Sequence, residues 1–464
     1  MKPNLRLLDA AALVAYASAV LVAVAHHEPW ADEAQSWVIA RDLSFGRMLF
    51  HEMHYEVSPG LWQSILWIAQ HVFHAPYPAM NWIAAAFAIA GAALLIFCAP
   101  FPRIVRYLMA SSFYISYQYA VIARPYVMLL LFAAAAAIFY RRRRLLLMSA
   151  SLALLTLVSV HGAVLAGAIF ASAAWREATQ WRSLAPQQCR TCLLALAIFV
   201  VAIVLLFAIA LPARDVVAVN PFRGGSLHKL VTVLENALVN PWYLAVPLLL
   251  VIAAFAVWRR QTIVFGLGVV GLIVFQAFFY GGPHHEGTIV IALIVALWIA
   301  WPDPSERMPD WFKPSIFAAV LCGIFAVQTV WAVRAWRTDY ALPYSGAADM
   351  AAYLHQIGAQ PAEISGFTYF AVALQPYFDH NIYANWPTAY VHHAQGSEPP
   401  LNQLTEANYT RYLVVPVLKG DLIPPLDQQL IRYGYVRAHI SPGRVLFNRG
   451  IWSSETFVLY QKAQ

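Results

Sequence analysis

Long apolar runs, separated by short turns rich in arginine, dominate this sequence and limit what it can fold into. Several runs reach the roughly 20 residues that a helix needs to cross a bilayer, among them 7–25, 78–99 and 314–333. Hydrophobic residues make up 61% of the 464 residues and charged residues only 11%, which is unlike a soluble domain. The pattern predicts a polytopic α-helical membrane protein.

The arginine clusters give these runs an orientation. Lys2 and Arg6 precede the first run, and four arginines occupy 141–144. With the N-terminus in the cytoplasm, every strong arginine cluster falls on the cytoplasmic side, as the positive-inside rule requires. This register predicts about eleven spans and a C-terminus outside, in the periplasm. The expected spans are 7–25, 78–99, the two arms of a hairpin over 104–140, 145–160, 163–175, 192–211, 241–257, 262–279, 288–301 and 314–333.

Charge and cysteine content exclude other classes. The net charge of +7 does not indicate nucleic-acid binding, because the arginines sit in short clusters between apolar runs. The four cysteines fall in spans or in expected cytoplasmic loops, so no disulfide framework is implied. Cys189-x-x-Cys192 lacks the second pair or histidine of a metal site. The first run has no small-residue cleavage signal after it, and we interpret it as a retained span.

The stretch 26–60 gathers polar groups in otherwise apolar surroundings. It follows the first span and lies in an expected outer loop, 26–77. A solvated loop would explain this composition, but acids and imidazoles collected at a membrane surface also suggest a functional site. Apolar spacing predicts a helix over 32–50 that lies flat in the interface with Trp30 and Trp37 at headgroup level, followed by a juxtamembrane helix over 61–73. The polar members are Glu28, Asp32, Glu33, Asp42, Glu52, Glu56, His26, His27, His51 and His54.

The composition changes after residue 333. Apolar runs shorten and proline becomes frequent, which predicts a small extracytoplasmic α/β domain over 334–464 behind a membrane domain over 1–333. An amphipathic pattern closed by glycine predicts a helix over 346–358. Four short segments have the composition of strands, namely 363–366, 412–417, 436–440 and 457–460.

Under this topology, polar features from distant parts of the chain meet on the outer side. A carboxylate such as Asp32 can take a proton from a hydroxyl nucleophile, and Arg124 can hold a phosphate through its two-pronged guanidinium. Simpler explanations exist. Arg124 can snorkel at the interface, Asp32 can act on a helix dipole, and His161 can sit in a turn. The segment His284-His285-Glu286 can be a solvated turn.

Three motifs resemble the GT-C glycosyltransferases, and within them the protein O-mannosyltransferases and aminoarabinose lipid A transferases. They are Asp32-Glu33, Ser58-Pro59-Gly60-Leu61-Trp62 and Tyr119-x4-Arg124-Pro125-Tyr126. The resemblance implies that Asp32 is the catalytic base and that Arg124 contacts the donor phosphate. The chain departs from the family at Ser58-Pro59, where Pro-Pro is common, and at 284–286, where an arginine or lysine is common.

The resemblance implies an inner-membrane enzyme of bacteria. It would move a hexosyl or pentosyl group from a polyprenyl-phosphate donor to a lipid, glycan or protein hydroxyl on the periplasmic side, with inversion. The site assignments are Asp32 and Glu33 as catalytic residues, Arg124, Tyr126, His284 and His285 at the donor phosphate, and His54, Glu56, His161 and Glu286 in acceptor or accessory roles. A divalent metal stays open as a cofactor, with His26, His27, His51 and His54 as candidate ligands.

Two other classes of function compete with this interpretation. A transporter or flippase of lipid-linked saccharides would have broken helices and an ion path within the membrane. The predicted spans carry few charges at mid-span, which argues against it. A non-catalytic scaffold that binds through its outer domain is the second rival.

Overall fold

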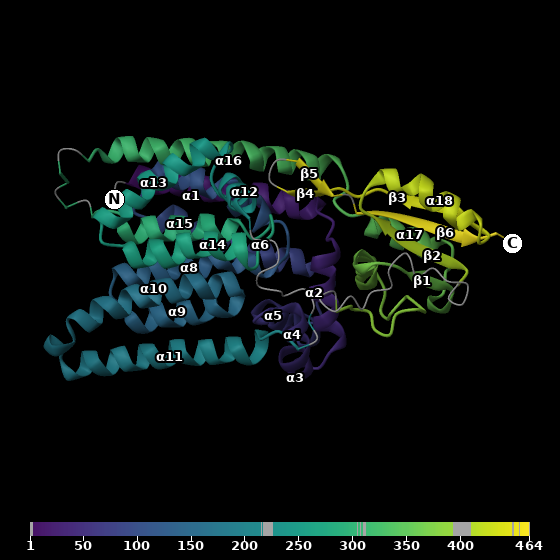
Figure 1. Ribbon diagram of the computed structural model, residues 1–464, viewed down its shortest axis with the longest axis horizontal. Helices are drawn as coiled ribbons and strands as arrows, with labels where there is room; N and C mark the ends of the chain where they lie inside the picture. Colours follow the sequence, from purple (N-terminus) through teal and green to yellow (C-terminus); the bar gives the residue numbers. More distant parts are fainter. Residues whose placement is uncertain are drawn as a thin grey trace.

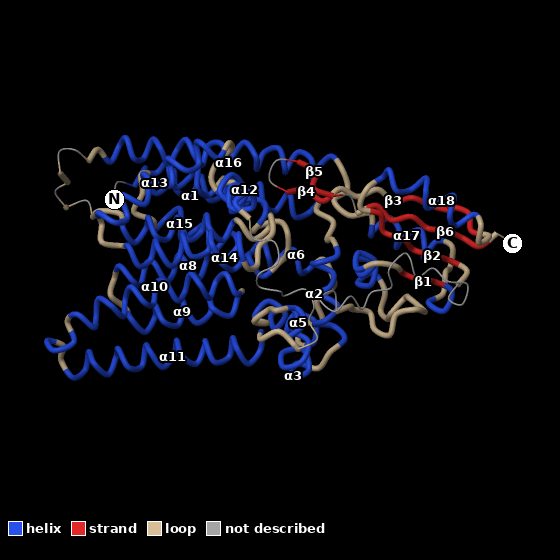
Figure 2. Tube along the Cα trace, in the orientation of Figure 1, coloured by secondary structure: helices blue, strands red, loops and turns tan. Residues whose placement is uncertain are grey.

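The computed structural model describes residues 3–214, 216, 226–303, 305–306, 308–309, 312–392, 410–447, 450–453 and 455–463. Long helices lie side by side in one body, and a small α/β domain continues it at one end (Figure 1). Strands are confined to that end of the molecule, which we call the domain end (Figure 2). Parts of the expected loops 212–240 and 302–313 lie outside the described residues.

Four described helices are long and apolar enough to cross a membrane. They confirm four expected spans as helices: α1 (Pro3–His26), α6 (Ala79–Cys98), α11 (Pro186–Ala210) and α16 (Pro314–Ala341). These apolar helices support a membrane-embedded protein, while the expected count of eleven spans stays a prediction. The shorter apolar helices are α8 (Leu129–Arg141), α9 (Leu145–Val158), α10 (Val160–Thr179), α14 (Gly271–Phe278, after a π-helix over Val264–Val270) and α15 (Gly287–Ala300).

The expected loop 212–240 contains a helix that the sequence did not suggest. Helix α12 (Leu227–Ala237) is followed by α13 (Trp242–Trp258), and the two are bent by 73°. Together they pass as a fifth apolar span, broken near its middle. Ser226 caps α12 by accepting a hydrogen bond from the backbone N–H of Lys229 at 3.1 Å.

The expected hairpin over 104–140 has one regular arm only. Helix α7 (Arg103–Ala110) stops early, a π-turn covers Tyr114–Gln118, and a 3-10 turn over Pro125–Met128 leads into α8. Serine explains the interruption, because its hydroxyl competes for backbone groups. Ser112 donates to the carbonyl of Met109 at 2.6 Å and Ser116 to that of Ser112 at 2.9 Å.

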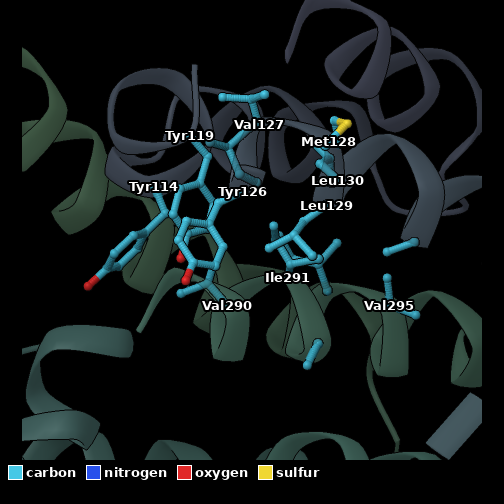
Figure 3. Close-up of a cluster of buried hydrophobic side chains, with 14 of the residues drawn as sticks. Tyr114, Tyr119, Tyr126, Val127, Met128, Leu129, Leu130, Val290, Ile291 and Val295 are labelled. Carbon is cyan, nitrogen blue, oxygen red and sulfur yellow. The ribbon is translucent and has the colours of Figure 1, made fainter. Parts of the chain in front are cut away.

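Aromatic rings from this interrupted segment form part of the core. Tyr114, Tyr119 and Tyr126 pack beside Val290 of α15 (Figure 3). Every residue of α15 is buried, so this short helix lies inside the layer and not at a lipid surface. Its uniformly apolar sequence follows from that position.

The expected interfacial helix over 32–50 is wrong in length and in place. Helix α2 (Ala31–Asp42) ends at Leu43, and the chain continues through α3 (Phe45–Arg47), a π-turn over Met48–Glu52 and α4 (Met53–Glu56). Trp30 and Trp37, expected at headgroup level, are only 5% and 3% exposed. Helix α2 is covered by α5 (Leu61–His71) and by a 3-10 segment of the C-terminal domain, Tyr369–Tyr377, so it is buried in protein.

The C-terminal domain contains a four-stranded sheet in the order β1-β2-β6-β3. All four expected strands are present, as β1 (Ile364–Gly366), β2 (Tyr412–Val417), β3 (Tyr435–Ser441) and β6 (Thr456–Lys462), and the expected helix is α17 (Ala347–Gln356). Strands β1 and β2 are parallel and the other pairs antiparallel. The sequence missed α18 (Ile423–Ile431) and the hairpin of β4 (Val445–Phe447) and β5 (Gly450–Ser453).

The core of this domain extends into the first loop of the membrane part. Ala31 and Ala34 of α2 belong to the same buried cluster as Ile364, Leu374 and Val414. The C-terminal domain and α2 therefore share apolar packing, which fixes the residues of α2 relative to the sheet.

The arginine clusters and the N-terminus lie together at the end opposite the C-terminal domain (Figure 1). Arg103 pairs with the buried Asp9 at 3.2 Å, Arg141 pairs with Asp303, and Arg259 bonds Glu306 at 2.8 Å. All basic turns that set the predicted orientation thus share one end of the helical layer.

We expect this end to be cytoplasmic and the C-terminal domain to be periplasmic. Single cysteines would be placed in a cysteine-free chain at two exposed positions, Arg143→Cys and Asp379→Cys. In intact spheroplasts a membrane-impermeant maleimide should label Asp379→Cys and should reach Arg143→Cys only after permeabilisation. Labelling of Arg143→Cys from outside would contradict the orientation.

Candidate active site

A polar cavity of about 610 Å³ lies at the domain end of the helical layer. Its walls come from α2, the turn before α5, the 124–126 turn, the start of α10, the end of α14 and the C-terminal domain. Five residues that the sequence assigned to the site line this cavity: Asp32, Glu56, Arg124, Tyr126 and His161. The fold therefore brings together polar residues up to 129 positions apart.

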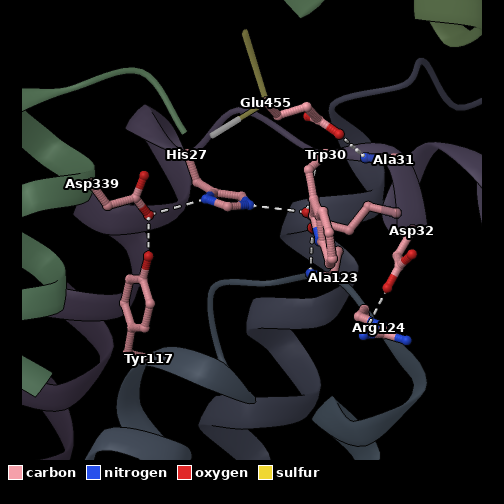
Figure 4. A network of polar contacts seen from close by, with 10 residues as sticks. His27, Trp30, Ala31, Asp32, Tyr117, Ala123, Arg124, Asp339 and Glu455 are labelled. Carbon is pink, nitrogen blue, oxygen red and sulfur yellow. Dashed lines mark hydrogen bonds and ion pairs between the residues drawn. The ribbon is translucent and has the colours of Figure 1, made fainter. Parts of the chain in front are cut away.

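Asp32 and Arg124 form the charged centre of the cavity. Nη1 of Arg124 lies 2.9 Å from Oδ2 of Asp32, and the hydroxyl of Tyr369 donates to Oδ1 at 2.9 Å. Figure 4 shows the ion pair between the start of α2 and the 124 turn. The Asp32 and Arg124 side chains are 20% and 18% exposed, so the pair is screened from bulk solvent yet open to the cavity.

Local sequence places both charges. Asp32 lies in the first turn of α2, where the helix dipole favours a carboxylate. Arg124 precedes a proline and has the extended backbone that such a residue prefers, with φ −118° and ψ 166°. Its guanidinium lies 5.6 Å from the ring centroid of Tyr126, and this cation–π contact stabilises its position.

The Ser58-Pro59-Gly60 motif forms another wall. Ser58 and Pro59 line the cavity, and Gly60 has φ +80° directly before α5. A Cβ at Gly60 would lie 2.5 Å from a side-chain carbon of Leu49, so this close turn requires glycine.

Glu33 is fully buried and does not line the cavity, although the sequence paired it with Asp32 as a catalytic residue. Its Oε1 accepts a hydrogen bond from the backbone N–H of Ala123 at 2.5 Å, and its Oε2 accepts one from that of Trp30 at 3.2 Å. Ala123 is the neighbour of Arg124. The geometry favours a positioning role in which Glu33 holds the 124 turn against α2.

A buried histidine extends this network to α16. His27 contacts Glu33 at 3.1 Å through Nε2 and Asp339 at 3.0 Å through Nδ1, and Tyr117 donates to Asp339 at 3.0 Å (Figure 4). Burial alone would lower the pKa of His27, but the carboxylates of Asp339 and Glu33 outweigh it and raise the pKa to about 10. His27 is therefore an imidazolium between two carboxylates at neutral pH.

Glu33→Gln should lower the free energy of unfolding by about 3–5 kcal/mol, because it breaks a buried ion pair and places an amide N–H against backbone donors. Thermal unfolding of the purified protein in detergent measures the effect. Glu177→Gln, which loosens the pair with Arg176 at the opposite end, is the control and should change stability by less than about 1 kcal/mol. Equal stability of Glu33→Gln and the parent would contradict this role.

The segment 284–286 lies behind the cavity and does not line it. The ring of His285 lies 5.6 Å from Tyr126 and 4.6 Å from His161, centroid to centroid, and His284 lies 6.4 Å from Tyr126. Glu286 accepts a hydrogen bond from the Tyr114 hydroxyl at 3.3 Å. The structure thus brings the two histidines next to the predicted phosphate site, but behind the ring of Tyr126.

The four histidines suggested as metal ligands are kept apart by their own contacts. His27 lies in the buried network, His26 packs against Tyr340, His51 contacts Glu52, and His54 contacts the carbonyl of Leu211. Among the residues that the structure describes, no group of three or more metal-binding side chains is placed to hold an ion. His54 also lies outside the cavity lining and joins α4 to the end of α11.

A carboxylic acid of the C-terminal domain meets the start of α2. Oε1 of Glu455 accepts a hydrogen bond from the backbone N–H of Ala31 at 3.0 Å (Figure 4). Burial raises the pKa of Glu455 to about 8, with the carboxylates of Asp32 and Glu33 acting in the same direction. Glu455 is thus largely protonated at neutral pH.

This raised pKa predicts that the parent loses stability as the pH rises. Below pH 4.5, the ordinary carboxyl pKa, Glu455 is protonated in both the native and the unfolded state. Between pH 4.5 and about 8 it loses its proton in the unfolded state and keeps it in the native state, so unfolding becomes more favourable. Glu455→Gln should therefore flatten the fall in melting temperature between pH 5 and pH 8. Glu363→Gln, at an exposed pair with Arg411, should follow the parent. An unchanged slope in Glu455→Gln would contradict the assignment.

An apolar groove of about 1110 Å³ adjoins the polar cavity. It runs between α10, α11 and α14, and Val57, Val160 and Tyr280 line both spaces. The cavity with the Asp32–Arg124 pair therefore lies next to an apolar groove at the side of the helical layer.

Sequence reasoning missed three groups that build this site. Tyr369 and Tyr280 line the cavity, and Asp339 holds His27, but no short motif marks any of them. Their partners lie far away in the chain, so only the packing of the C-terminal domain, of α16 and of the turn after α14 reveals them.

Comparison with known proteins finds a similarity in three-dimensional structure and no match to a sequence family. No family model and no curated protein sequence matches the chain. Among solved structures, that of ArnT from Cupriavidus metallidurans bound to undecaprenyl phosphate superposes with a TM-score of 0.54 and 14% sequence identity, over 99% of this chain and 98% of that one. This likeness confirms the GT-C-like fold that the resemblance implied, while the number of spans and the domain boundary stay predictions.

Proposed function

We propose that this chain is a membrane glycosyltransferase that moves a sugar from a polyprenyl-phosphate donor to an acceptor hydroxyl on the periplasmic side of a bacterial inner membrane. One observation carries the proposal. A carboxylate, Asp32, and a guanidinium, Arg124, face a single polar cavity that opens beside an apolar groove. The GT-C fold shared with ArnT supports it.

Arg124 suits the phosphate of the donor. A guanidinium binds two phosphate oxygens at once, and the ring of Tyr126 keeps it in place. In the structure the carboxylate of Asp32 is the ion-pair partner of Arg124. A phosphate that displaces Asp32 exchanges one anion for another at Arg124 and frees the carboxylate to act as a base.

The reaction is a direct displacement at the anomeric carbon. The acceptor oxygen forms a bond to this carbon as the bond to the phosphate oxygen breaks, and Asp32 takes the acceptor proton. Polyprenyl phosphate leaves with its new charge held by Arg124. A single displacement inverts the configuration at the anomeric carbon.

The lipid tail of the donor fits the apolar groove. The groove and the cavity share the lining residues Val57, Val160 and Tyr280, which supports the proposal that one ligand places its phosphate at Arg124 and its tail between α10 and α11. The solved structure of ArnT carries undecaprenyl phosphate, a ligand of this kind.

The other assigned residues take supporting parts in the proposal. Glu33 positions the 124 turn. Glu56 and His161 line the cavity on the acceptor side. His284 and His285 were predicted at the donor phosphate, and in the proposal they lie against the ring of Tyr126 and support it.

The 73° bend between α12 and α13 is the feature that favours the alternative, a flippase for lipid-linked saccharides. Against it, the charged centre lies at the domain end of the helical layer and not halfway along it. A glycosyltransferase explains the paired base and phosphate site, whereas a flippase requires neither.

Turnover of a radiolabelled polyprenyl-phosphate sugar by the purified protein separates the two functions. With a membrane lipid extract as acceptor, we expect label to move to a new product while free polyprenyl phosphate accumulates. In proteoliposomes a flippase would carry the intact donor across the bilayer without cleaving it. Intact donor after prolonged incubation with extracts of several bacteria would contradict the transferase.

A further inference from the structure

The C-terminal domain reaches into the cavity with one side chain. Tyr369 follows β1 and begins the 3-10 segment Tyr369–Tyr377, and its hydroxyl donates to Oδ1 of Asp32 at 2.9 Å. The ring also lines the cavity beside Arg124. A contact between residues 337 positions apart joins the two parts of the chain at the charged centre.

We propose that Tyr369 is a positioning residue for the sugar transfer, and that through it the C-terminal domain forms part of the catalytic unit. Its hydroxyl holds one oxygen of Asp32 so that the other oxygen points to the acceptor. The inference rests on the proposed function, in which Asp32 is the base.

The backbone that carries Tyr369 is packed against α2. Ala371–Gln375 of the same segment are buried against α2. Arg41 of α2 donates through Nη1 to the carbonyl of Gln375 at 3.1 Å and to that of Phe378 at 2.6 Å. Tyr369 is thus fastened to the same helix that carries Asp32, which fixes the distance between them.

The residue before Tyr369 has a strained backbone. Thr368 has φ +64° and ψ 157°, a region that is almost reserved for glycine. The chain turns sharply there, and Tyr369 is the next residue. Strain of this kind persists where the surrounding structure overdetermines it, and it is common beside functional groups.

Tyr369 is suited to act as a donor at all working pH values. Burial raises the pKa of Tyr369 above its ordinary value, and the carboxylates of Asp32 and Glu56 add to this. The hydroxyl therefore keeps its proton.

The two partners of Asp32 have separate tasks. Arg124 contacts Oδ2 and Tyr369 contacts Oδ1. When a donor phosphate takes Arg124, Tyr369 still donates to Oδ1, while Oδ2 becomes available for the acceptor proton.

Tyr369→Phe tests this role, because it removes the hydroxyl and keeps the ring. We expect kcat to fall roughly 10-fold or more, as for loss of a hydrogen bond to a charged group, and the KM for the donor to stay within about twofold, since Arg124 is untouched. A lower kcat at an unchanged KM distinguishes this role from a merely structural defect, which would lower the amount of folded protein instead.

Tyr377→Phe is the matched control, because Tyr377 ends the same 3-10 segment and contacts Tyr77 away from the cavity. It should keep the kcat and the KM of the parent. If Tyr369→Phe does not fold, Tyr369→Leu serves in its place, with the same expected fall in kcat.

Two outcomes separate the claims. An unchanged kcat in Tyr369→Phe, beside an inactive Asp32→Asn, would overturn this inference and leave the proposed function standing. Full turnover in Asp32→Asn would instead show that Asp32 is not the base, and it would overturn both this inference and the proposed function.

Discussion

Asp32→Asn should reduce turnover by roughly 10²–10⁴-fold while the protein folds and binds donor normally, because the change removes a positioned base. Asparagine keeps the size of the side chain and can still accept the hydrogen bond from Tyr369. Only basicity and the charge facing Arg124 are lost. The comparison is made as kcat with a radiolabelled polyprenyl-phosphate sugar, alongside thermal unfolding.

A structural role for Asp32 predicts a different result. A carboxylate in the first turn of α2 stabilises the helix dipole by about 0.3–1 kcal/mol, and its loss would lower stability slightly without stopping turnover. Asp42→Asn is the matched control, because Asp42 ends the same helix and pairs with Arg41 outside the cavity. We expect it to turn over like the parent. If Asp32→Asn turns over like the parent while Glu33→Gln is inactive, the roles of Asp32 and Glu33 are swapped.

Arg124→Ala should weaken donor binding by roughly 30-fold or more. Truncating one partner of a hydrogen-bonded charge pair costs about 2–5 kcal/mol, and about 2 kcal/mol corresponds to that factor. The pair here is about four-fifths buried, and Asp32 would face an incoming phosphate without its counter-ion. Titration with undecaprenyl phosphate, followed by native mass spectrometry or calorimetry, gives the dissociation constants.

Arg124→Lys distinguishes shape from charge. An ammonium cannot reproduce the planar fork of a guanidinium, so affinity should stay well below that of the parent although the charge is kept. Arg143→Ala, at an exposed position in the turn at the opposite end, should bind donor normally. Equal affinity of Arg124→Ala and the parent would exclude the phosphate role.

Asp32 and Arg124 could be predicted from the sequence, because the residues that set the membrane orientation are recognisable in short stretches of the chain. Asp32 follows the first apolar run, and Arg124 stands before a proline in the middle of a long apolar stretch. Arginine clusters on one side then require both residues to lie on the other. The structure brings their side-chain atoms to 2.9 Å.

Contacts that depend on docking could not be predicted in this way. His27 meets Asp339 across 312 positions, and Tyr369 meets Asp32 across 337. The candidate metal ligands show the opposite case. His26, His27, His51 and His54 are close in sequence, but the end of α1 and the turns after α2 point them to different neighbours.

Helix α2 shows why burial was misjudged. Its apolar residues suggested a helix with one face in the interface, but nine of its twelve residues are buried, since α5 and the C-terminal domain cover it. The strands were easier to predict. Strand β2 is apolar throughout because both faces of the sheet are packed, and Tyr412 and Leu413 lie in different clusters.

A structure of this protein with undecaprenyl phosphate bound tests the central claim most directly. We predict that the phosphate contacts the guanidinium of Arg124, that the Asp32–Arg124 ion pair opens, and that the lipid tail lies in the groove between α10 and α11. A phosphate bound elsewhere, with the Asp32–Arg124 pair still closed, would contradict the account.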